Sequence, residues 1–299
     1  MPNIDWQGIY PALTTKFTAA DEIDWEAMEK HLAFQLDGGV HGLIVLGSLG
    51  ENSTLSAEEK IEMVRFFARA DRAGRPLLAG VAESSTRKAK AFVRDAEEAG
   101  ADGFMLLPPM RYASDRRETL TYLQEVAAAT SLPIMLYNNP VVYGTDLTPE
   151  DFARLADNPR FEAIKEAADD TRRFSQIRRL VGDRFALFCG IDDLALECFA
   201  VGAVGWVAGL VVAFPRETVR LWELCRDGEW EAARRLYDWF LPLMHLDTGP
   251  KFVQQIKLVE ALMGVGSAKV RAPRLQLSEA EASRVEEILA AALERRPTL

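Results

Sequence analysis

Lys165 is the residue of this chain best placed for covalent chemistry. It lies in the apolar run 161–167, where a lysine at the end of a strand would be partly buried and would lose hydration of its charged form. The pKa of such a lysine falls, so a neutral, nucleophilic amine becomes available near neutral pH, as a Schiff-base lysine requires. The competing interpretation is a solvated lysine beside Glu166.

Two further segments carry groups that could assist such an amine. Tyr137 ends an apolar run, and its phenol could move protons during carbinolamine and imine formation, although a core tyrosine with its hydroxyl at a wet edge is the alternative. Ser48 lies between Gly47 and Gly50 in a tight turn. Glycines there permit positive φ, so backbone N–H groups and the Ser48 hydroxyl could hold a carboxylate; an ordinary turn is the competing interpretation.

The elements that must position these residues alternate short apolar runs with amphipathic segments. Helices are predicted, for example, over 24–36 and over 57–72, the second opened by Ser56 with Glu59 three residues later as a capping box. Apolar strands separated by helices predict a parallel sheet, and eight such units close a (β/α)8 TIM barrel of the α/β class. The predicted strands occupy runs 7–14, 42–46, 76–82, 103–107, 133–137, 161–165, 185–189 and 205–208.

In a barrel of this kind, chemistry gathers at the carboxyl ends of the strands. The turn at 47–51, Tyr137, Lys165, Gly190 and Gly209 all follow or close predicted strands, so we expect them to converge. From Glu229 onward the chain predicts three further helices packed outside the barrel. The predicted organisation is a barrel over 1–228 and a helical C-terminal extension over 229–299.

Composition narrows the classes of partner. The net charge is -10 and basic residues are scattered, so nucleic acid and anionic membranes are poor candidates. The three cysteines, Cys189, Cys198 and Cys225, lack metal or redox spacing and indicate a reducing compartment. With no signal pattern and no long apolar stretch, the expectation is a soluble cytoplasmic protein that acts on a small molecule.

Metal and cofactor chemistry is not predicted. The three histidines, His31, His41 and His245, are widely separated, and two of them fall in predicted helices. The glycines around strand 8 could suit a phosphate, but the apolar segment 206–208 offers a phosphate no cation. We therefore expect no metal and no organic cofactor.

Five motifs occur in an order and spacing that resemble the dihydrodipicolinate synthase and N-acetylneuraminate lyase superfamily of class I Schiff-base enzymes, across nearly the whole chain. They are the turn Gly47-Ser48-Leu49-Gly50-Glu51, the segment Tyr137-Asn138-Asn139-Pro140, the strand Ala163-Ile164-Lys165, the segment 188–193 and the tail 270–278.

The resemblance implies a role for each matching residue. Lys165 would form the imine and Tyr137 would transfer protons. Ser48 and the Leu49 backbone N–H would hold the carboxylate of a 2-oxo acid, with a main-chain contact from Val207. Gly47, Asn139 and Gly190 would complete the substrate site. The resemblance also implies a homotetramer built as a dimer of dimers.

Departures from the family pattern bear on the substrate. Dihydrodipicolinate synthases have a second threonine where this chain has Leu49, so their proton relay is expected to be broken here. They also have an arginine for a second carboxylate where this chain has Val142. Their neighbour-subunit tyrosine would fall near Met110, although Tyr112 could substitute. Lysine biosynthesis is therefore disfavoured.

The motifs are most similar to those of 1-pyrroline-4-hydroxy-2-carboxylate deaminases of hydroxyproline degradation, which release ammonia and 2,5-dioxopentanoate. The first alternative is an aldolase or dehydratase acting on a 2-keto-3-deoxy sugar acid. N-acetylneuraminate lyase ranks lower. A polyhydroxylated substrate would need hydroxyl-bearing residues directly after Lys165, and Glu166, Ala167 and Ala168 follow it instead. From another class, a non-catalytic barrel that binds a small carboxylate also fits, but the presence of both Lys165 and Tyr137 argues against it.

Overall fold

A computed structural model describes residues 4–109, 112 and 114–298, and its centre is a barrel of eight parallel strands. All eight predicted apolar runs form strands, and β5 and β6 each extend one residue past the predicted end. The strands are β1 (Gly8–Pro11), β2 (Leu43–Val45), β3 (Leu77–Val81), β4 (Gly103–Leu106), β5 (Ile134–Asn138), β6 (Phe161–Glu166), β7 (Ala186–Cys189) and β8 (Gly205–Ala208).

The order of the strands around the sheet is β1-β8-β7-β6-β5-β4-β3-β2, with every pair parallel. β1 and β2 meet through a parallel bridge between Ala12 and Ile44. The N–H of Leu13 also donates to the carbonyl of Ile44 at 2.8 Å. These contacts bring the two ends of the sheet together, and the TIM barrel prediction is confirmed.

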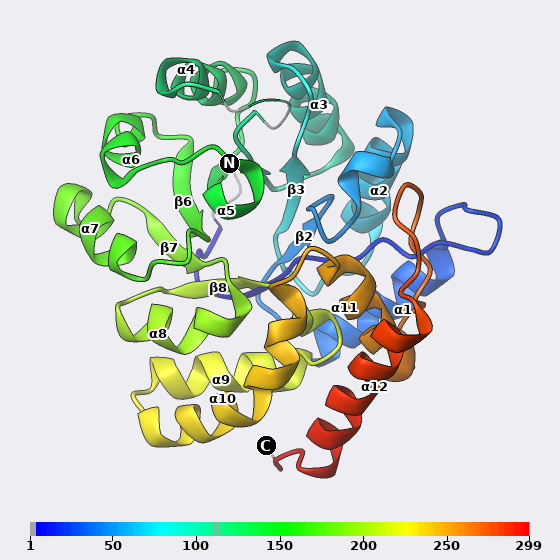
Figure 1. Ribbon diagram of the computed structural model, residues 1–299. Coiled ribbons are helices and arrows are strands. Elements are labelled where there is room, and N and C mark those ends of the chain that lie inside the picture. Colours follow the sequence, from blue (N-terminus) through cyan, green and yellow to red (C-terminus); the bar gives the residue numbers. More distant parts are fainter. Residues whose placement is uncertain (1–3, 110–111, 113, 299) are drawn as a thin grey trace.

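Helices surround the barrel on its outside (Figure 1). The predicted capping box of α2 is present, because Ser56 and Glu59 bond each other's backbone N–H groups, and Asp24 caps α1. These outer helices are α1 (Trp25–Asp37), α2 (Ala57–Arg69), α3 (Thr86–Ala99), α4 (Arg116–Ala127), α6 (Pro149–Leu155), α7 (Arg172–Val181), α8 (Ala195–Ala200) and α9 (Pro215–Arg226). The short α5 (Pro140–Tyr143) lies in the connection after β5.

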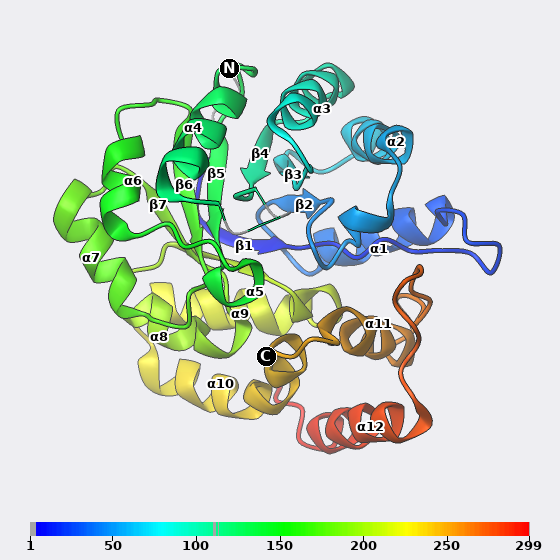
Figure 2. The same cartoon turned by 45° about the horizontal axis from the view of Figure 1, so that its top comes forward.

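The predicted helical C-terminal part is also present. It comprises α10 (Trp230–Met244), the 3-10 turn η4 (His245–Asp247), α11 (Phe252–Leu262) and α12 (Glu279–Glu294). Figure 2 shows these helices gathered on one side of the barrel, where α12 packs against both α10 and α11. The predicted boundary between residues 228 and 229 falls in the short connection between α9 and α10.

Aromatic side chains fill the barrel near the start of β1 and β8. The ring of Tyr10 stacks on Trp6 at 6.2 Å and meets Phe188 edge-on at 5.3 Å. Gly205 leaves room for this packing, since a Cβ there would lie 2.3 Å from the Phe188 ring. The interior is therefore closed at the amino ends of the strands, and the opposite end is left for chemistry.

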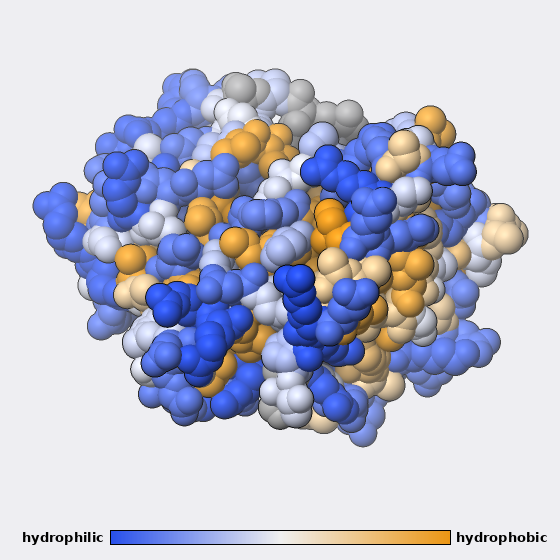
Figure 3. Space-filling model, turned by 60° about the horizontal axis from the view of Figure 1, so that its bottom comes forward, coloured by the Kyte–Doolittle hydropathy of each residue, from blue (hydrophilic) through white to orange (hydrophobic). Residues whose placement is uncertain are grey.

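The surface is mostly polar. Figure 3 shows one face, on which hydrophilic residues predominate and apolar residues gather in small patches near the middle. Within the described part of the chain, no helix has the length and apolar character needed to cross a bilayer. The three cysteines are buried and unpaired.

Candidate active site

A small cavity of about 80 Å³ lies at the carboxyl ends of the strands and brings together every residue that the sequence analysis selected. Its lining includes the two proposed reacting residues, Lys165 and Tyr137, and two residues of the proposed carboxylate turn, Ser48 and Leu49. The remaining expected substrate contacts that line it are Gly47, Asn139, Gly190 and Val207. Five separate strand ends thus converge on one space, as the barrel geometry predicted.

Lys165 is 7% exposed and is the last but one residue of β6, opposite Tyr137 of β5. Its Nζ atom lies 4.1 Å from the centroid of the Tyr137 ring. Burial lowers the pKa of Lys165, and the negative charges of nearby groups, among them Asp247 and Asp192, oppose this shift only in part. The site therefore favours the neutral amine more than water does.

Gly190 makes room for this lysine. A Cβ at position 190 would lie 2.9 Å from Lys165 Cε and 2.8 Å from the Cβ of Ala167. Gly190 was expected from the sequence to contact the substrate. In the structure, the absence of a side chain at position 190 allows the side chain of Lys165 to reach the cavity.

A chain of hydroxyl groups runs along the β5 side of the cavity. Ser48 and Tyr143 share a short hydrogen bond, and Tyr143 in turn hydrogen-bonds Tyr137. The Nδ2 atom of Asn139 donates to the Tyr137 hydroxyl at 3.2 Å. Burial raises the pKa of Tyr137 to about 12, and the hydrogen bonds from Asn139 and Tyr143 oppose that shift.

Tyr143 was missed by the sequence analysis, which expected the relay to be broken at Leu49. Leu49 does lack a hydroxyl, but Tyr143 supplies one from the end of α5. The tyrosine is held there by local geometry, since Asn139 caps this turn by accepting from the Val142 N–H at 3.0 Å, and Gly144 ends it with a φ of 71°. Leu49 thus interrupts the relay at the expected position, and Tyr143 places another hydroxyl beside Ser48.

The proposed carboxylate turn is built differently from the expectation. Its positive φ angles occur at Leu46 (62°) and Glu51 (55°), not at Gly47 or Gly50. Gly50 is needed for space, because a Cβ there would lie 2.8 Å from the carbonyl oxygen of Leu13. The left-handed conformation of two non-glycine residues costs energy and must be held by surrounding contacts.

Those contacts come largely from Glu51, whose side chain is fully buried. Lys257 of α11 donates to Glu51 Oε1 at 2.8 Å and to the carbonyl of Thr15, also at 2.8 Å. The backbone N–H of Arg271 donates to the second carboxylate oxygen at 3.0 Å. Thr15 itself donates to the Gly50 carbonyl at 2.6 Å, so the C-terminal part holds the turn from behind.

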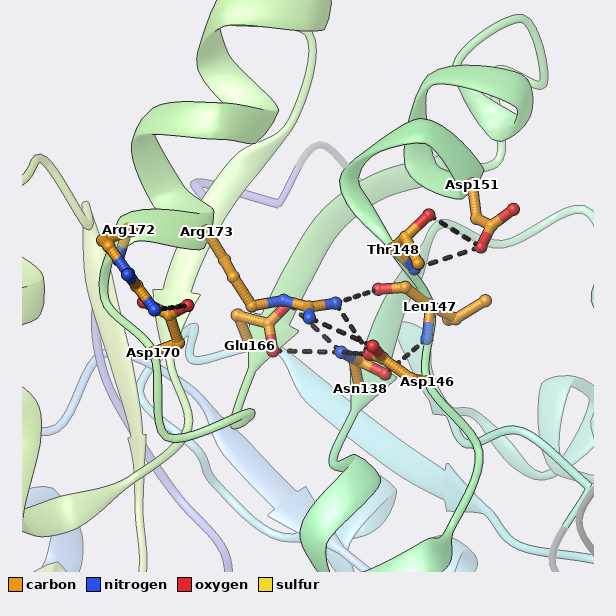
Figure 4. A network of polar contacts seen from close by, with 9 residues as sticks. All are labelled: Asn138, Asp146, Leu147, Thr148, Asp151, Glu166, Asp170, Arg172 and Arg173. Atoms are coloured by element: carbon orange, nitrogen blue, oxygen red, sulfur yellow. Dashed lines mark hydrogen bonds and ion pairs between the residues drawn. The ribbon is translucent and has the colours of Figure 1, made fainter.

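A second polar network fixes the ends of β5 and β6 on their outer side (Figure 4). Asn138 donates to Glu166 at 3.0 Å, and Arg173 of α7 pairs with both Glu166 and Asp146. Burial raises the pKa of Glu166 to about 7, although Arg173 opposes the shift. Because Glu166 points outward, the neighbouring Lys165 faces the cavity.

Two aspartates near Lys165 were not singled out from the sequence. Asp192 is 1% exposed and accepts from Trp206 Nε1 at 3.0 Å and from the N–H groups of Gly209 and Leu210 at 3.1 and 2.8 Å. Asp247 belongs to η4 in the C-terminal part, and its carboxylate lines the cavity. The extension was expected to pack outside the barrel, but it also contributes this acid to the site.

The cavity has a distinctive balance of charge. Among the described residues that line it, Lys165 is the only cation and Asp247 the only acid. Val142, which occupies the place of the family's arginine, is 61% exposed at the cavity edge. No group of three or more His, Cys, Asp or Glu among the described residues is arranged to hold a metal ion.

The expected neighbour-subunit tyrosine was assigned near Met110, which lies outside the described residues. Tyr112 is 58% exposed and lines a separate hollow with Pro109 and Thr121. Within one subunit it does not line the Lys165 cavity, and the hydroxyl chain there is supplied by Tyr143 instead.

Comparison with known proteins agrees with this geometry. The dihydrodipicolinate synthetase family profile matches residues 5–292. A 4-hydroxy-tetrahydrodipicolinate synthase of Archaeoglobus fulgidus is 32% identical over 287 residues, covering 95% of this chain and 97% of that protein. The enzyme of the same name from Staphylococcus carnosus is 32% identical over 291 residues, covering 95% and 96%.

Solved structures agree as well. The 4-hydroxy-tetrahydrodipicolinate synthase of Methylacidiphilum fumariolicum SolV superposes with a TM-score of 0.92 at 31% identity, covering 97% of this chain and 96% of that one. A prophage protein of E. coli K12 from the dihydrodipicolinic acid synthase family, solved in complex with pyruvate, has a TM-score of 0.90 at 28% identity, covering 96% and 98%. The chain belongs to the dihydrodipicolinate synthetase family.

Proposed function

We propose that this member of the family is a Schiff-base lyase for a small 2-oxo or cyclic 2-imino acid with one carboxylate, and that its substrate is 1-pyrroline-4-hydroxy-2-carboxylate. The observation that carries the proposal is the charge of the cavity. A second carboxylate would find no cationic partner besides Lys165 among the described lining residues. One carboxylate, held at the Ser48 turn, suffices for the pyrroline.

The chemistry begins with the amine of Lys165. It adds to C2 of the cyclic imine and displaces the ring nitrogen, which stays attached at C5 as a free amine. The new imine between Lys165 and C2 acts as an electron sink, so a proton is lost from C3 to form an enamine. The enamine expels the C4 hydroxyl as water and leaves a double bond between C3 and C4.

Ammonia is released in the second half. A proton leaves C5 and another is added at C3, which moves the double bond to C4 and C5 and makes the C5 amine an enamine. Loss of a proton from that nitrogen and addition of a proton at C4 then give the C5 imine. One water hydrolyses this imine to an aldehyde and ammonia, and a second water hydrolyses the Lys165 imine to free 2,5-dioxopentanoate. One water is lost and two are consumed, so the net reaction is addition of one water and loss of ammonia.

The hydroxyl chain suits the proton transfers around Lys165. The high pKa of Tyr137 makes its phenol a proton donor in its resting form, and Ser48 and Tyr143 can resupply that proton. The ring nitrogen of the geminal diamine formed at C2 needs a proton in order to leave, and so does the nitrogen of the carbinolamine formed in each hydrolysis. Assembly as a homotetramer and a cytoplasmic location accompany this proposal as expectations from the family resemblance.

Two other activities use the same imine. The similarity to 4-hydroxy-tetrahydrodipicolinate synthases favours that activity, whereas Val142, which replaces the family's arginine at the cavity, disfavours a substrate with a second carboxylate. Cleavage or dehydration of a 2-keto-3-deoxy sugar acid is compatible with a cavity that offers Asp247 and Asn139 to hydroxyl groups.

The test traps the imine and then separates the activities. The protein is incubated with pyruvate or the hydroxypyrroline, reduced with borohydride and digested; the expected mass adduct lies on the Lys165 peptide and is absent from Lys165→Ala. Absence of any adduct from the wild-type protein would reject the Schiff base. Ammonia release from the hydroxypyrroline identifies the deaminase. Pyruvate release from a keto-deoxy acid would instead identify an aldolase. Condensation of pyruvate with aspartate semialdehyde would identify a 4-hydroxy-tetrahydrodipicolinate synthase.

A further inference from the structure

The carboxylate of Asp247 occupies a space that the barrel has left for it. The φ of Gly209 is −91°, which any residue adopts, yet a Cβ there would lie 2.7 Å from both carboxylate oxygens of Asp247. All three nearest atoms to that position belong to Asp247. The glycine after β8 is therefore required by the aspartate and not by the backbone.

Tyr137 and Asp247 approach Lys165 from strands on either side of β6. Tyr137 is the last but one residue of β5, the neighbour of β6 on one side, while Asp247 lies against Gly209, which follows β8, beyond β7 on the other side. Asp192 holds the backbone of Gly209 in place by accepting its N–H. An imine formed on Lys165 would thus have a phenol on one side and a carboxyl group on the other.

We propose that Asp247 contacts the substrate directly, binding the C4 hydroxyl and giving it the proton with which it leaves as water. This inference rests on the proposed function and names the part of the substrate that the cavity selects. Neither of the two groups assigned to the imine serves this end of the substrate, because Lys165 is bonded to C2 and the Tyr137 hydroxyl is held by Asn139 and Tyr143.

Protonation of Asp247 supports its role as an acid. Burial and the adjacent carboxylate of Asp192 raise the pKa of Asp247 well above its ordinary value, and the charge of Lys165 opposes the shift. Asp193, the other acid that acts on Asp247, raises the pKa as well. Asp192 accepts from three N–H donors. Of the adjacent pair Asp192 and Asp247, Asp192 is therefore the better placed to carry the negative charge.

The elimination step balances with this acid. The nitrogen lone pair of the enamine reforms the C2 imine, and the electron pair between C2 and C3 moves to C3 and C4. The C4–O bond breaks with both electrons on oxygen, which takes the proton of Asp247. The resulting carboxylate regains a proton from solvent before the next turnover.

Asp247→Asn tests the acid, because the amide keeps the shape of the carboxyl group but cannot give up a proton in this way. We expect borohydride trapping of pyruvate on Lys165 to stay within about twofold of wild type, while ammonia release from the hydroxypyrroline falls by roughly 10²- to 10⁴-fold. The matched control is Asp238→Asn, which changes an exposed carboxyl group of α10 that does not line the cavity. That variant should retain turnover.

A binding measurement tests the contact without turnover. The hydroxypyrroline and 1-pyrroline-2-carboxylate, which lacks the hydroxyl, compete with pyruvate for trapping on Lys165. Wild-type protein should prefer the hydroxylated compound by about tenfold, and Asp247→Ala should lose that preference. Equal competition in the wild-type protein would overturn the contact.

The outcomes separate this inference from the function on which it rests. Failure of the wild-type protein to form any adduct at Lys165 rejects the proposed function. The role of Asp247 alone is rejected if the wild-type protein forms the adduct and releases ammonia normally while Asp247→Asn turns over within threefold of the wild-type rate. Equal losses of trapping and turnover in Asp247→Asn would also overturn it, because they would show an effect on Lys165 itself.

Discussion

The amine of Lys165 lies over the face of the Tyr137 ring, 4.1 Å from its centroid, and not against its hydroxyl. The ring therefore contributes a packing surface and a cation–π contact, while the hydroxyl belongs to the chain with Asn139 and Tyr143. These two contributions of one residue can be separated by mutation.

Tyr137→Phe keeps the ring and removes the hydroxyl. We expect the Lys165 adduct with pyruvate to form, because the amine keeps its environment, while turnover falls by about 10²- to 10⁴-fold. Rates of trapping and of ammonia release measure the two effects. Tyr122→Phe is the control, because its buried hydroxyl has no hydrogen-bond partner among the described residues, and turnover should not change. Turnover near the wild-type rate in Tyr137→Phe would reduce the phenol to a packing role.

Ser48→Ala and Tyr143→Phe each interrupt the hydroxyl chain at a different member. If the proton moves along the chain as one unit, the two single variants lose kcat to a similar extent and the double variant is no slower than the worse single one. Multiplicative losses in the double variant would show that the two hydroxyls act independently, with Ser48 serving the carboxylate alone.

Gly209→Ala tests the position of the Asp247 carboxylate. Overpacking of this kind costs about 1–3 kcal/mol in the free energy of unfolding, and most of that cost should disappear in an Asp247→Ala background. Urea unfolding of the wild type, both single variants and the double variant measures the coupling, expected at about 1 kcal/mol or more. Additive effects would show that Asp247 does not lie against position 209.

The pair of Lys257 and Glu51 is predicted to stabilise the fold and the carboxylate turn together. Lys257→Met leaves the buried Glu51 with only the more distant Arg274, at 3.8 Å, as a cationic partner, which should cost about 3 kcal/mol in the free energy of unfolding and raise KM. Lys30→Met is the control, because Lys30 and Glu26 form an exposed pair, 74% and 77% accessible, whose loss should leave the free energy of unfolding nearly unchanged. A similar loss in both variants would contradict a special role for the buried pair.

Glu166 predicts a dependence of stability on pH. Burial raises its pKa from 4.5 to about 7 in the folded chain, so the folded state holds a proton that the unfolded state has already released. The stability tied to this proton is fully present below about pH 4.5 and falls by about 3 kcal/mol as the pH rises to about 7.

Unfolding in urea across this pH range should therefore show a steeper loss of stability for wild type than for Glu166→Gln. Glu150→Gln, which changes an exposed carboxyl group on α6, is the control and should follow the wild-type slope. Parallel slopes for wild type and Glu166→Gln would contradict the raised pKa.

The strands and the residues at their ends were predictable because each carries a local signal. Lys165 interrupts an apolar run, and Gly47 and Gly50 flank Ser48 within a few positions of a strand. A parallel barrel then brings all strand ends to one face, so their convergence on one cavity follows from topology alone.

Tyr143 and Asp247 were not predictable in the same way. Tyr143 follows Pro140 in a turn, and only the cap made by Asn139 directs it toward Ser48. Asp247 lies far along the chain from β8, between helices, with no strand to mark its position. The one signal was Gly209, a glycine that closes a strand without needing positive φ, which indicates the close approach of another group.

The site draws on two stretches of chain that can diverge separately. Lys165 and Tyr137 sit in the barrel, whereas Asp247 and the lysine that supports the carboxylate turn, Lys257, lie close together in the C-terminal part. Exchange of that short stretch between relatives would carry substrate preference from one protein to another and leave the imine-forming apparatus in place. Selectivity and reactivity would then be inherited as distinct traits of one fold.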